Sequence, residues 1–400
     1  MPGEPSWNGH GFRSPWIERS STMAISMLGT PSGAPVYFYV PPSIFSDIPK
    51  NETQFLDWEE RGDYHGVASW VVLTYLRLRQ AHYPVQFIQT LPEHGIVITH
   101  ARVLRDQPAE IPPEVMLVCI EGDRGRSSSA FFHLVQNPVQ EWRSAPWRRF
   151  YVPYWTQPGL VPRERGRDDR FETIGFFGNT FNLAPELRGE DWRDALNRMG
   201  LCWEPRLSHE DWYDYSGVDG VIAIRSFHRH WNGAWKPANK LFNAWSAGAI
   251  PIIGRESAML YHAAHRVDCM VCNSVDQLLA CLDELRESKD LRRALRANGA
   301  ERAAEFQRDE IVKLWVDVID SVLVPTFQGL HGRGVLWSLR RLESGATYLV
   351  DWGDRYRRYF TGKIAAKLDR KSTRDVFRDA AGIKQWRRWW RCCIAMRARL

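Results

Sequence analysis

The first third of the chain carries short apolar runs that are bounded by glycine and proline. Near-continuous apolar runs are typical of parallel strands that helices cover on both faces. A longer run over residues 65–80 places Trp70, Leu73 and Leu76 on one side at helical spacing and predicts a helix. The strands are expected at residues 36–40, 85–89, 95–100, 114–120 and 131–135. This pattern predicts a mostly parallel sheet with helices packed on it.

The alternation of strands and helices begins again after a passage rich in proline and arginine, residues 156–170. A strand is expected to end at Gly178, and two more are expected at residues 220–225 and 249–254. These runs are again β-branched and continuous, as in a buried parallel sheet. The chain therefore contains the same kind of pattern twice.

The helices of the second half have apolar residues at the i, i+3, i+4 and i+7 positions of a buried helical face. A capping box of Ser274 and Gln277 starts one helix, and Gly200 is placed to stop another. Two more helices are expected near residues 291–306 and 309–322. The buried positions of the first three helices are expected to be Trp192, Ala195, Leu196 and Met199; Leu241, Ala244, Trp245 and Gly248; and Leu278, Cys281, Leu282 and Leu285.

A chain of 400 residues is longer than one hydrophobic core usually supports. We therefore expect two Rossmann-like, doubly wound α/β domains that face a cleft, followed by a basic helical tail. The expected divisions are a flexible lead-in (1–34), a first domain (35–155), a linker (156–170), a second domain (171–325) and a basic, Trp-rich helical tail (326–400).

The composition, 44% hydrophobic and 25% charged, is ordinary for a globular protein. No run of about 18 uncharged apolar residues predicts a spanning helix, and the first residues lack the order of a secretory signal. Seven cysteines without regular spacing favour a reducing, cytoplasmic location over a disulfide framework. Cys269 and Cys272 form a CxxC, which we interpret as buried structural cysteine, because zinc needs a second ligand pair and a redox site needs a helix start.

The net charge of +6 is concentrated in the tail, where residues 331–400 hold 18 Lys and Arg against 6 Asp and Glu. The last twenty residues place apolar side chains on one helical face, which suits a peripheral position on an anionic membrane surface. A helix that packs back on the first domain needs the same pattern. Nucleic acid is not expected as a partner, since no nucleic-acid-binding module accompanies the charge.

The loop after residues 220–225 gathers an unusual amount of positive charge, including Arg225, His228 and Lys236. Arg225 closes a strand, and ligands of open α/β sheets bind beyond the carboxyl ends of the strands. Pro237 suits the first turn of the next helix, whose free N–H groups and dipole attract anions. Lys240 in that turn opposes the dipole, which is favourable only if an anion with two charges lies between Lys240 and Arg225. The loop therefore predicts a phosphate site.

The alternative is that Arg225 and Lys240 pair with carboxylates of the protein itself. The loop histidines either meet phosphate or ribose or face solvent, and the loop tryptophans either stack on a base or sugar or pack between domains. The residues left open in this way are Asp211, Asp214 and Asp219 as carboxylates, His228 and His230, and Trp231 and Trp235.

The segment KPANKLFNAWSAGAIPIIG, residues 236–254, resembles the helix–strand segment of the donor-binding domain in GT-B glycosyltransferases. Its pattern is most similar to that of fucosyltransferase-like and exostosin-like families, and the order of elements agrees over residues 173–325. The resemblance implies transfer of a sugar from a nucleotide-diphosphate-sugar donor to a hydroxyl acceptor, either a glycan or a lipid-linked one. The first domain would then bind the acceptor and the second the donor.

The resemblance also implies roles for individual residues. Arg225 and Lys240 would hold the diphosphate, with His228, Lys236, Asn239 and Asn243 close by. Gly178 and Asn179 would form the glycine loop that faces the donor, and Glu256 would reach the ribose or the base. The paired glutamates (E-x7-E) that flank this helix start in many retaining members are absent here.

No metal and no cofactor are expected. A D-x-D motif is missing, because EGDRGR offers only Glu121 and Asp123. Arginine, lysine and the helix dipole would then neutralise the leaving diphosphate.

A general base is expected in the first domain, where Asp63 or His65 would take the proton of the acceptor hydroxyl. The alternative makes Asp63 a plain helix N-cap and His65 a surface residue. Glu93 and His100 are lesser candidates. Two rival functions share this fold: a non-catalytic protein that binds a nucleotide or glycan, and a sugar-nucleotide epimerase.

Overall fold

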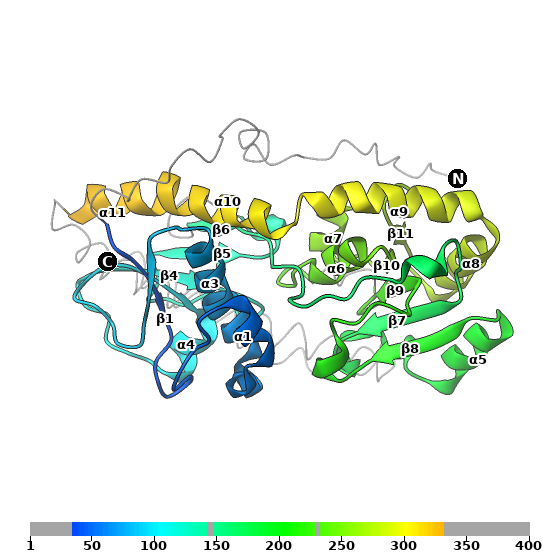
Figure 1. Ribbon diagram of the computed structural model, residues 1–400, viewed down its shortest axis with the longest axis horizontal. Coiled ribbons are helices and arrows are strands. Elements are labelled where there is room, and N and C mark those ends of the chain that lie inside the picture. The colour runs from blue at the N-terminus through cyan, green and yellow to red at the C-terminus, as the bar shows by residue number, and fades with distance from the viewer. Residues whose placement is uncertain (1–33, 142–147, 229–232, 332–400) are drawn as a thin grey trace, which may run out of the picture. The chain divides into compact units, whose positions relative to one another are not determined.

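The computed structural model describes residues 34–141, 148–228 and 233–331, and these form two parallel β-sheets with their helices (Figure 1). The described residues do not include residues 1–33 of the lead-in, most of the basic tail, or His230 and Trp231. Within the described ranges, no helix has the length and apolar character needed to cross a membrane. Two Rossmann-like α/β sheets are what the sequence predicted.

The first sheet has six strands in the order β2-β1-β3-β4-β5-β6, and every neighbouring pair is parallel. The five strands predicted in this half are confirmed. The sixth was missed because it is three residues long and includes only one fully buried residue, Phe150. The strands are β1 (Val36–Tyr39), β2 (Val85–Ile88), β3 (His94–His100), β4 (Glu114–Ile120), β5 (Phe132–Val135) and β6 (Arg149–Tyr151).

The predicted helix over residues 65–80 is present as α2 (His65–Val67), a π-helical turn (Ala68–Val72) and α3 (Leu73–Gln80). Trp70, Leu73 and Leu76 are buried as expected. The helix is buried more widely than its apolar pattern suggested, because polar side chains on it have partners inside the protein. The indole N–H of Trp155, for example, donates to Thr74 Oγ1 at 2.8 Å.

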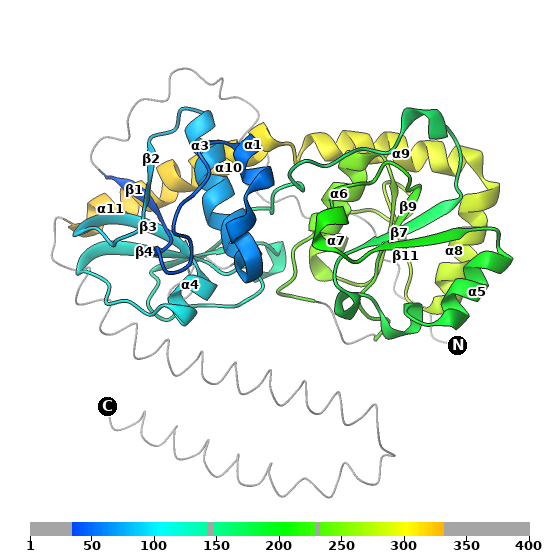
Figure 2. The same cartoon turned by 60° about the horizontal axis from the view of Figure 1, so that its bottom comes forward.

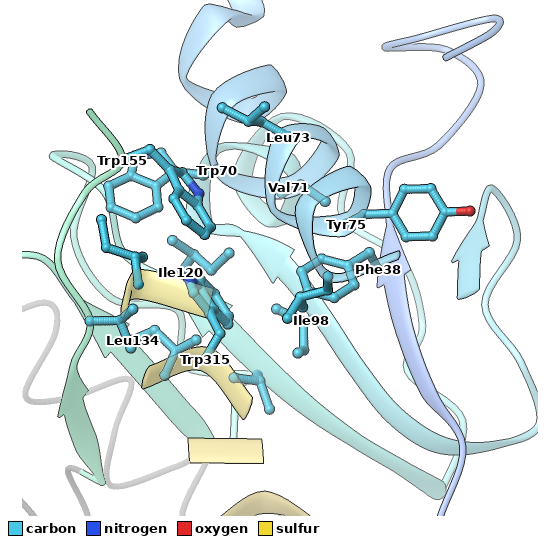
Figure 3. Packing of buried hydrophobic residues seen from close by; sticks show 14 of the residues in the cluster. Phe38, Trp70, Val71, Leu73, Tyr75, Ile98, Ile120, Leu134, Trp155 and Trp315 are labelled. Carbon is cyan, nitrogen blue, oxygen red and sulfur yellow. The ribbon is translucent and has the colours of Figure 1, made fainter. Parts of the chain in front are cut away.

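Phe38 of β1 lies in the centre of the core of this sheet (Figure 3). Its ring is 6.4 Å from the ring of Tyr75 on α3 and 6.1 Å from that of Trp315 on α10 (Arg308–Val318). The helix continues through a π-helical turn (Ile319–Leu323) into α11 (Val324–His331).

Helix α10 was expected to complete the second domain, but its contacts are with elements of the first sheet. Besides Trp315 on Phe38, Asp320 in the following turn accepts a hydrogen bond of 2.5 Å from the hydroxyl of Tyr83. The spacing of apolar residues identifies the buried face of a helix but not the sheet that buries it. This is why the sequence placed α10 on the wrong sheet.

The second sheet has five parallel strands in the order β11-β10-β9-β7-β8. Strand β8 was not expected, because its sequence CWEPR contains proline and charge. Such a sequence is tolerated at the edge of a sheet, where β8 lies. The strands are β7 (Thr173–Phe177), β8 (Cys202–Arg206), β9 (Gly220–Ala223), β10 (Ile250–Ile253) and β11 (Met270–Val271).

Helices cover both faces of the second sheet (Figure 2). Val221 of β9 packs with Ala244 of α6 (Asn239–Ala247). Its neighbour Ile222 packs in a separate cluster with Leu278 of α8 (Val275–Glu287) and Trp192 of α5 (Glu190–Arg198). Because successive side chains of a strand point to opposite faces, α6 and the pair α5–α8 lie on opposite sides. The predicted doubly wound architecture is thereby confirmed.

The remaining helices are short or lie along the two sheets (Figure 1). They are α1 (Glu52–Asp57), α4 (Ala101–Asp106), α5 (Glu190–Arg198), α7 (Ser257–His262), α8 (Val275–Glu287) and α9 (Lys289–Ala304).

Most predicted helix ends agree with the structure. Ser274 Oγ accepts from the backbone N–H of Gln277 at 3.2 Å, as in a capping box. Gly200 follows its helix with φ of +70°, the left-handed conformation of a C-terminal glycine, as predicted. Gly248 was expected on the buried face of the next helix, but it follows α6 with φ of +74° and ends that helix in the same way. The expected start at Pro237 is wrong, because α6 begins at Asn239 and Pro237 precedes it.

The cysteines of the CxxC flank β11 and are buried, as the sequence predicted. Cys269, Cys272 and Cys281 are free thiols. The described residues contain no group of three or more metal-ligating side chains of His, Cys, Asp or Glu.

The passage before β7 is fastened to the second sheet by the buried carboxylate of Asp219. Asp219 accepts hydrogen bonds from Arg163 (2.8 Å) and Arg167 (2.7 Å), and from the backbone N–H groups of Glu172 (2.9 Å) and Thr173 (3.0 Å). Burial alone would raise the pKa of Asp219, but these hydrogen bonds outweigh it and lower the pKa below its ordinary value of 3.8. The cluster therefore contributes its stability above about pH 4 and loses it as the pH falls further.

Asp219→Asn is predicted to lower the free energy of unfolding by about 3 kcal/mol, because it leaves two guanidinium groups without their carboxylate. Asp283→Asn is the matched control, since Asp283 forms an exposed pair with Arg286 whose loss changes stability by about 0.5 kcal/mol or less. Urea denaturation at pH 7 measures both. Equal effects of the two substitutions would show that Asp219 does not fasten this passage.

Candidate functional site

The second sheet changes direction between β7 and β9. From β7 the chain moves outward to β8, and it then returns to place β9 on the other side of β7. In open α/β sheets a ligand crevice forms at such a switch point, beyond the carboxyl ends of the strands. Four residues lie there, at or after the ends of β7, β9 and β10 and in the first turn of α6. We call Gly178, Arg225, Lys240 and Glu256 the switch-point site.

Lys240 is the second residue of α6, and its side chain is buried. Its ammonium group donates to the backbone carbonyl of Phe177 at the end of β7, and it lies 5.0 Å from the ring centre of Phe176. Burial, together with the nearby charge of Arg225, lowers the pKa of Lys240 to about 7. The side chain of Lys240 therefore changes between its charged and neutral forms near neutral pH.

Gly178 lies directly against that ammonium group. Its φ of +138° disfavours any other residue, and a Cβ atom at this position would lie only 2.7 Å from Lys240 Nζ. The backbone after β7 therefore approaches Lys240 as closely as the chain allows.

Arg225 spans the switch point from the end of β9. Its Nε donates to Asn182 Oδ1 in the loop after β7 at 3.3 Å, and its Nη1 donates to the carboxylate of Glu256. The alternative in which Arg225 pairs with a carboxylate is therefore correct in kind, although its partner is none of the three aspartates considered. Asp219 instead binds Arg163 and Arg167.

Glu256 precedes α7 and is buried. One carboxylate oxygen accepts from Arg225, whereas Oε1 has no hydrogen-bond partner among the described residues. Burial raises the pKa of Glu256, and Arg225 and Lys240 oppose that shift. The switch-point site thus combines two cations with one carboxylate and a buried acceptor oxygen that has no donor.

Three other predicted donor-site residues lie around this cluster. Asn239 is the first residue of α6, and Asn179 is exposed in the loop after β7. His228 is exposed in the loop after β9, where its backbone N–H donates to Ser226 Oγ at 3.1 Å. Their contact with a donor stays a prediction.

Two predicted donor-site residues have polar partners elsewhere in the protein. Asn243 Oδ1 accepts from the backbone N–H of Gln157 at 2.9 Å and so holds the passage between the two sheets. Lys236 Nζ donates to Asp123 Oδ2 at 3.0 Å, and this contact outweighs desolvation and lowers the pKa of Asp123, whose side chain is exposed. Sequence spacing placed both residues near the site but gave no information on these partners.

The two predicted catalytic residues lie at the start of the 65–80 helix. Asp63 is exposed, and its backbone carbonyl accepts from Arg102. Helix α2 has no side-chain cap, so Asp63 is not the N-cap that the alternative required. The ring of His65 stacks on that of His209, with 3.3 Å between ring centroids. A catalytic role of either residue stays a prediction.

Sequence reasoning missed two residues of the loop after β7, Phe181 and Asn182. The side chain of Phe181 is 72% exposed, the largest exposure among the exposed large apolar residues in the described part of the chain. A large apolar residue in a polar loop (GNTFN) directly after a buried strand was the available signal.

His100 was considered as a base and is unsuited to that role. It ends β3, its Nδ1 accepts from the backbone N–H of Arg102 at 3.1 Å, and it is buried. Burial lowers the pKa of His100 to about 3, so the ring is neutral at physiological pH and caps α4.

No family profile and no curated protein match this chain. Among solved structures, the pneumococcal O-GlcNAc transferase GtfA in complex with UDP and GlcNAc is 11% identical, with a TM-score of 0.40, over 63% of this chain and 60% of its own. HepE from Anabaena in complex with UDP and glucose is 11% identical, with a TM-score of 0.44, over 72% of this chain and 100% of its own. Sucrose-phosphate synthase from Thermosynechococcus elongatus is 12% identical, with a TM-score of 0.40, over 63% and 78%.

This chain therefore spans less than two thirds of GtfA. At TM-scores below 0.5 these likenesses do not bear on the chemistry of the switch-point site. The narrower resemblance to fucosyltransferase-like and exostosin-like families also stays a prediction.

The low pKa of Lys240 makes a prediction about stability. An unfolded lysine keeps its proton up to about pH 10.5, whereas native Lys240 releases it near pH 7. Unfolding therefore takes up a proton between these values, and the free energy of unfolding rises with pH by up to about 1.4 kcal/mol per unit. Lys240→Met is expected to remove this slope in urea titrations from pH 7 to 9, whereas Lys313→Met, at a surface pair, keeps it. Equal slopes in the wild type and Lys240→Met would contradict the assignment.

Proposed function

We propose that the chain is a glycosyltransferase of the GT-B type that transfers a sugar from a nucleotide-diphosphate-sugar donor to a hydroxyl acceptor. The observation that carries the proposal is the convergence of Arg225 and Lys240, both largely buried, on a switch point at the N-terminus of α6. Two buried cations against one carboxylate leave an excess of positive charge where a diphosphate is expected to lie.

The diphosphate would replace Glu256 as the partner of Arg225 and the carbonyl of Phe177 as the partner of Lys240. Arg225 offers a planar guanidinium suited to two phosphate oxygens, and Lys240 offers a point charge next to the free N–H groups of α6. As the glycosidic bond breaks, negative charge grows on the leaving diphosphate, and these fixed groups stabilise it without a metal. Because an anion favours the charged ammonium, donor binding would also raise the pKa of Lys240 and take up a proton.

Glu256 would distinguish the donor from simple phosphate. Its Oε1 has no donor among the described residues, and a buried acceptor without a donor is unfavourable. A ribose hydroxyl or a base N–H would satisfy it. Phe181, exposed on the loop after β7, would stack on the base.

The acceptor would be a glycan or a lipid-linked hydroxyl bound by the first sheet, with Asp63 or His65 as the base. Asp63 suits this role in its exposure to solvent, which leaves its carboxylate accessible to an acceptor. For a lipid-linked acceptor, the basic tail would hold the protein at the membrane surface.

Turnover of sugar nucleotides tests the proposal. Wild type is expected to hydrolyse or transfer sugar from one member of a panel of UDP-, GDP- and TDP-sugars. Lys240→Met is expected to reduce that rate about 100-fold or more, as loss of one preorganised donor does. A second variant combines Arg225→Gln with Glu256→Gln, because Arg225→Gln alone would leave the buried carboxylate of Glu256 without its partner. Arg266→Ala, which removes an exposed arginine paired with Glu284, is the control and should keep the rate.

Two other outcomes would identify one of the two rival functions. Binding of a nucleotide without turnover would identify a non-catalytic binding protein, and conversion of the donor sugar without an acceptor would identify an epimerase. Full activity in Lys240→Met would remove the diphosphate assignment.

Phe181→Ala is predicted to raise KM for the donor about fivefold to tenfold and to leave kcat nearly unchanged, because base stacking contributes roughly 1–1.5 kcal/mol of binding in both ground and transition states. Val139→Ala removes another exposed apolar side chain and serves as the control. An unchanged KM would exclude stacking by Phe181.

A further inference from the structure

A second concentration of positive charge lies at the opposite, amino end of the second sheet. A broad, open depression of about 830 Å³ lies there between the start of α9 and the passage that leads into β7. Its volume is in the range of small-molecule sites. The lining residues are Arg170, Lys289, Arg292, Arg293 and Arg296, with Asp168 and Asp169. We call this surface the α9 pocket.

The two carboxylates do not neutralise the five cations. Asp169 alone binds both Lys289 (2.7 Å) and Arg293 (2.8 Å). The buried carboxylate of Asp219 already binds Arg163 and Arg167. The pocket therefore keeps a net positive charge.

Arg170 and Arg296 hydrogen-bond only to backbone carbonyls among the described residues. Arg296 donates to the carbonyls of Asp168 (3.1 Å) and Arg170 (3.0 Å), and its buried Nε has no partner there. Arg170 donates to the carbonyl of Gly166 at 2.6 Å. Arg292 has a sufficient internal role, because it binds the carbonyls of Leu285 and Arg286 at the end of α8.

Lys289 and Arg293 share the single carboxylate of Asp169 at a helix end that favours further negative charge. Both lie in the first turns of α9, where the helix dipole favours negative charge. The helix has 16 residues and only one acidic residue, Asp290, in its first turn. Asp168 in the facing passage adopts φ of +39°, an uncommon conformation that presents its carbonyl to Arg296.

We propose that the α9 pocket binds a small polyanion with two or more phosphoryl groups, at a site separate from the switch point. The anion would lie between Arg296 and Arg170 on one side and Lys289 and Arg293 on the other. Its source is either a free phosphorylated metabolite or a phospholipid headgroup. This proposal does not depend on glycosyl transfer, because the two sites lie at opposite ends of the sheet.

Pyrophosphate titration of the full chain by calorimetry tests the pocket. Lys240→Met with Arg225→Gln and Glu256→Gln serves as the background, so that the switch-point site does not contribute. The side chains of Lys289 and Arg293 are exposed, so their substitution leaves the fold intact. In this background Lys289→Gln with Arg293→Gln is expected to weaken binding more than about tenfold. Arg296→Gln should do the same, with its fold checked by circular dichroism. Arg286→Gln, outside the pocket on α8, should change nothing.

The result that overturns the proposal is unchanged pyrophosphate affinity in Lys289→Gln with Arg293→Gln, or an equal loss in Arg286→Gln. Sedimentation with phosphatidylcholine vesicles, with and without phosphatidylinositol 4-phosphate, whose headgroup carries two phosphoryl groups, separates the two sources. Loss of vesicle binding in the pocket variant identifies a headgroup, and loss of pyrophosphate binding alone identifies a free phosphate. Failure of the switch-point site would appear separately, as unchanged turnover in Lys240→Met.

Discussion

The burial of Lys240 beside Arg225 is the constraint on which the site depends. Two like charges inside a protein are unfavourable unless each finds a partner. Here the partners are the carbonyl of Phe177 for Lys240 and the carboxylate of Glu256 for Arg225. Because the strands are parallel, the ends of β7, β9 and β10 meet at one edge of the sheet, and the residues that follow them lie close together. Burial, together with the charge of Arg225, lowers the pKa of Lys240.

The protein uses its other buried charges differently. Around Asp219, two arginines and two backbone N–H groups donate to the carboxylate, so both of its oxygens have donors and the cluster is structural. At the switch point, and among the residues that the structure describes, one oxygen of Glu256 has no donor and Lys240 donates only to a carbonyl. Incomplete pairing in a buried cluster is what separates a candidate ligand site from a structural one.

The sequence predicted the helices and strands better than it predicted which of them pack together. Continuous apolar runs identified β1, β3, β4 and β9, because a strand that is buried on both faces is apolar at nearly every position. It missed β6 and β8, which are short or polar, and it could not decide which sheet buries Trp315. For the site, Arg225 and Lys240 followed from strand and helix ends. The contacts of Arg225 with Asn182 and Glu256, and that of Asn243 with Gln157, did not follow, because they join segments far apart in the chain.

The central claim is that Arg225 and Lys240 bind the two phosphates of a nucleoside diphosphate. A crystal structure of the protein with UDP tests it most directly. The account predicts phosphate oxygens within hydrogen-bond distance of both side chains and of the first N–H groups of α6, with Arg225 drawn from Glu256. A nucleotide bound elsewhere, with the Arg225–Glu256 pair and the Lys240–Phe177 bond unchanged, would contradict it.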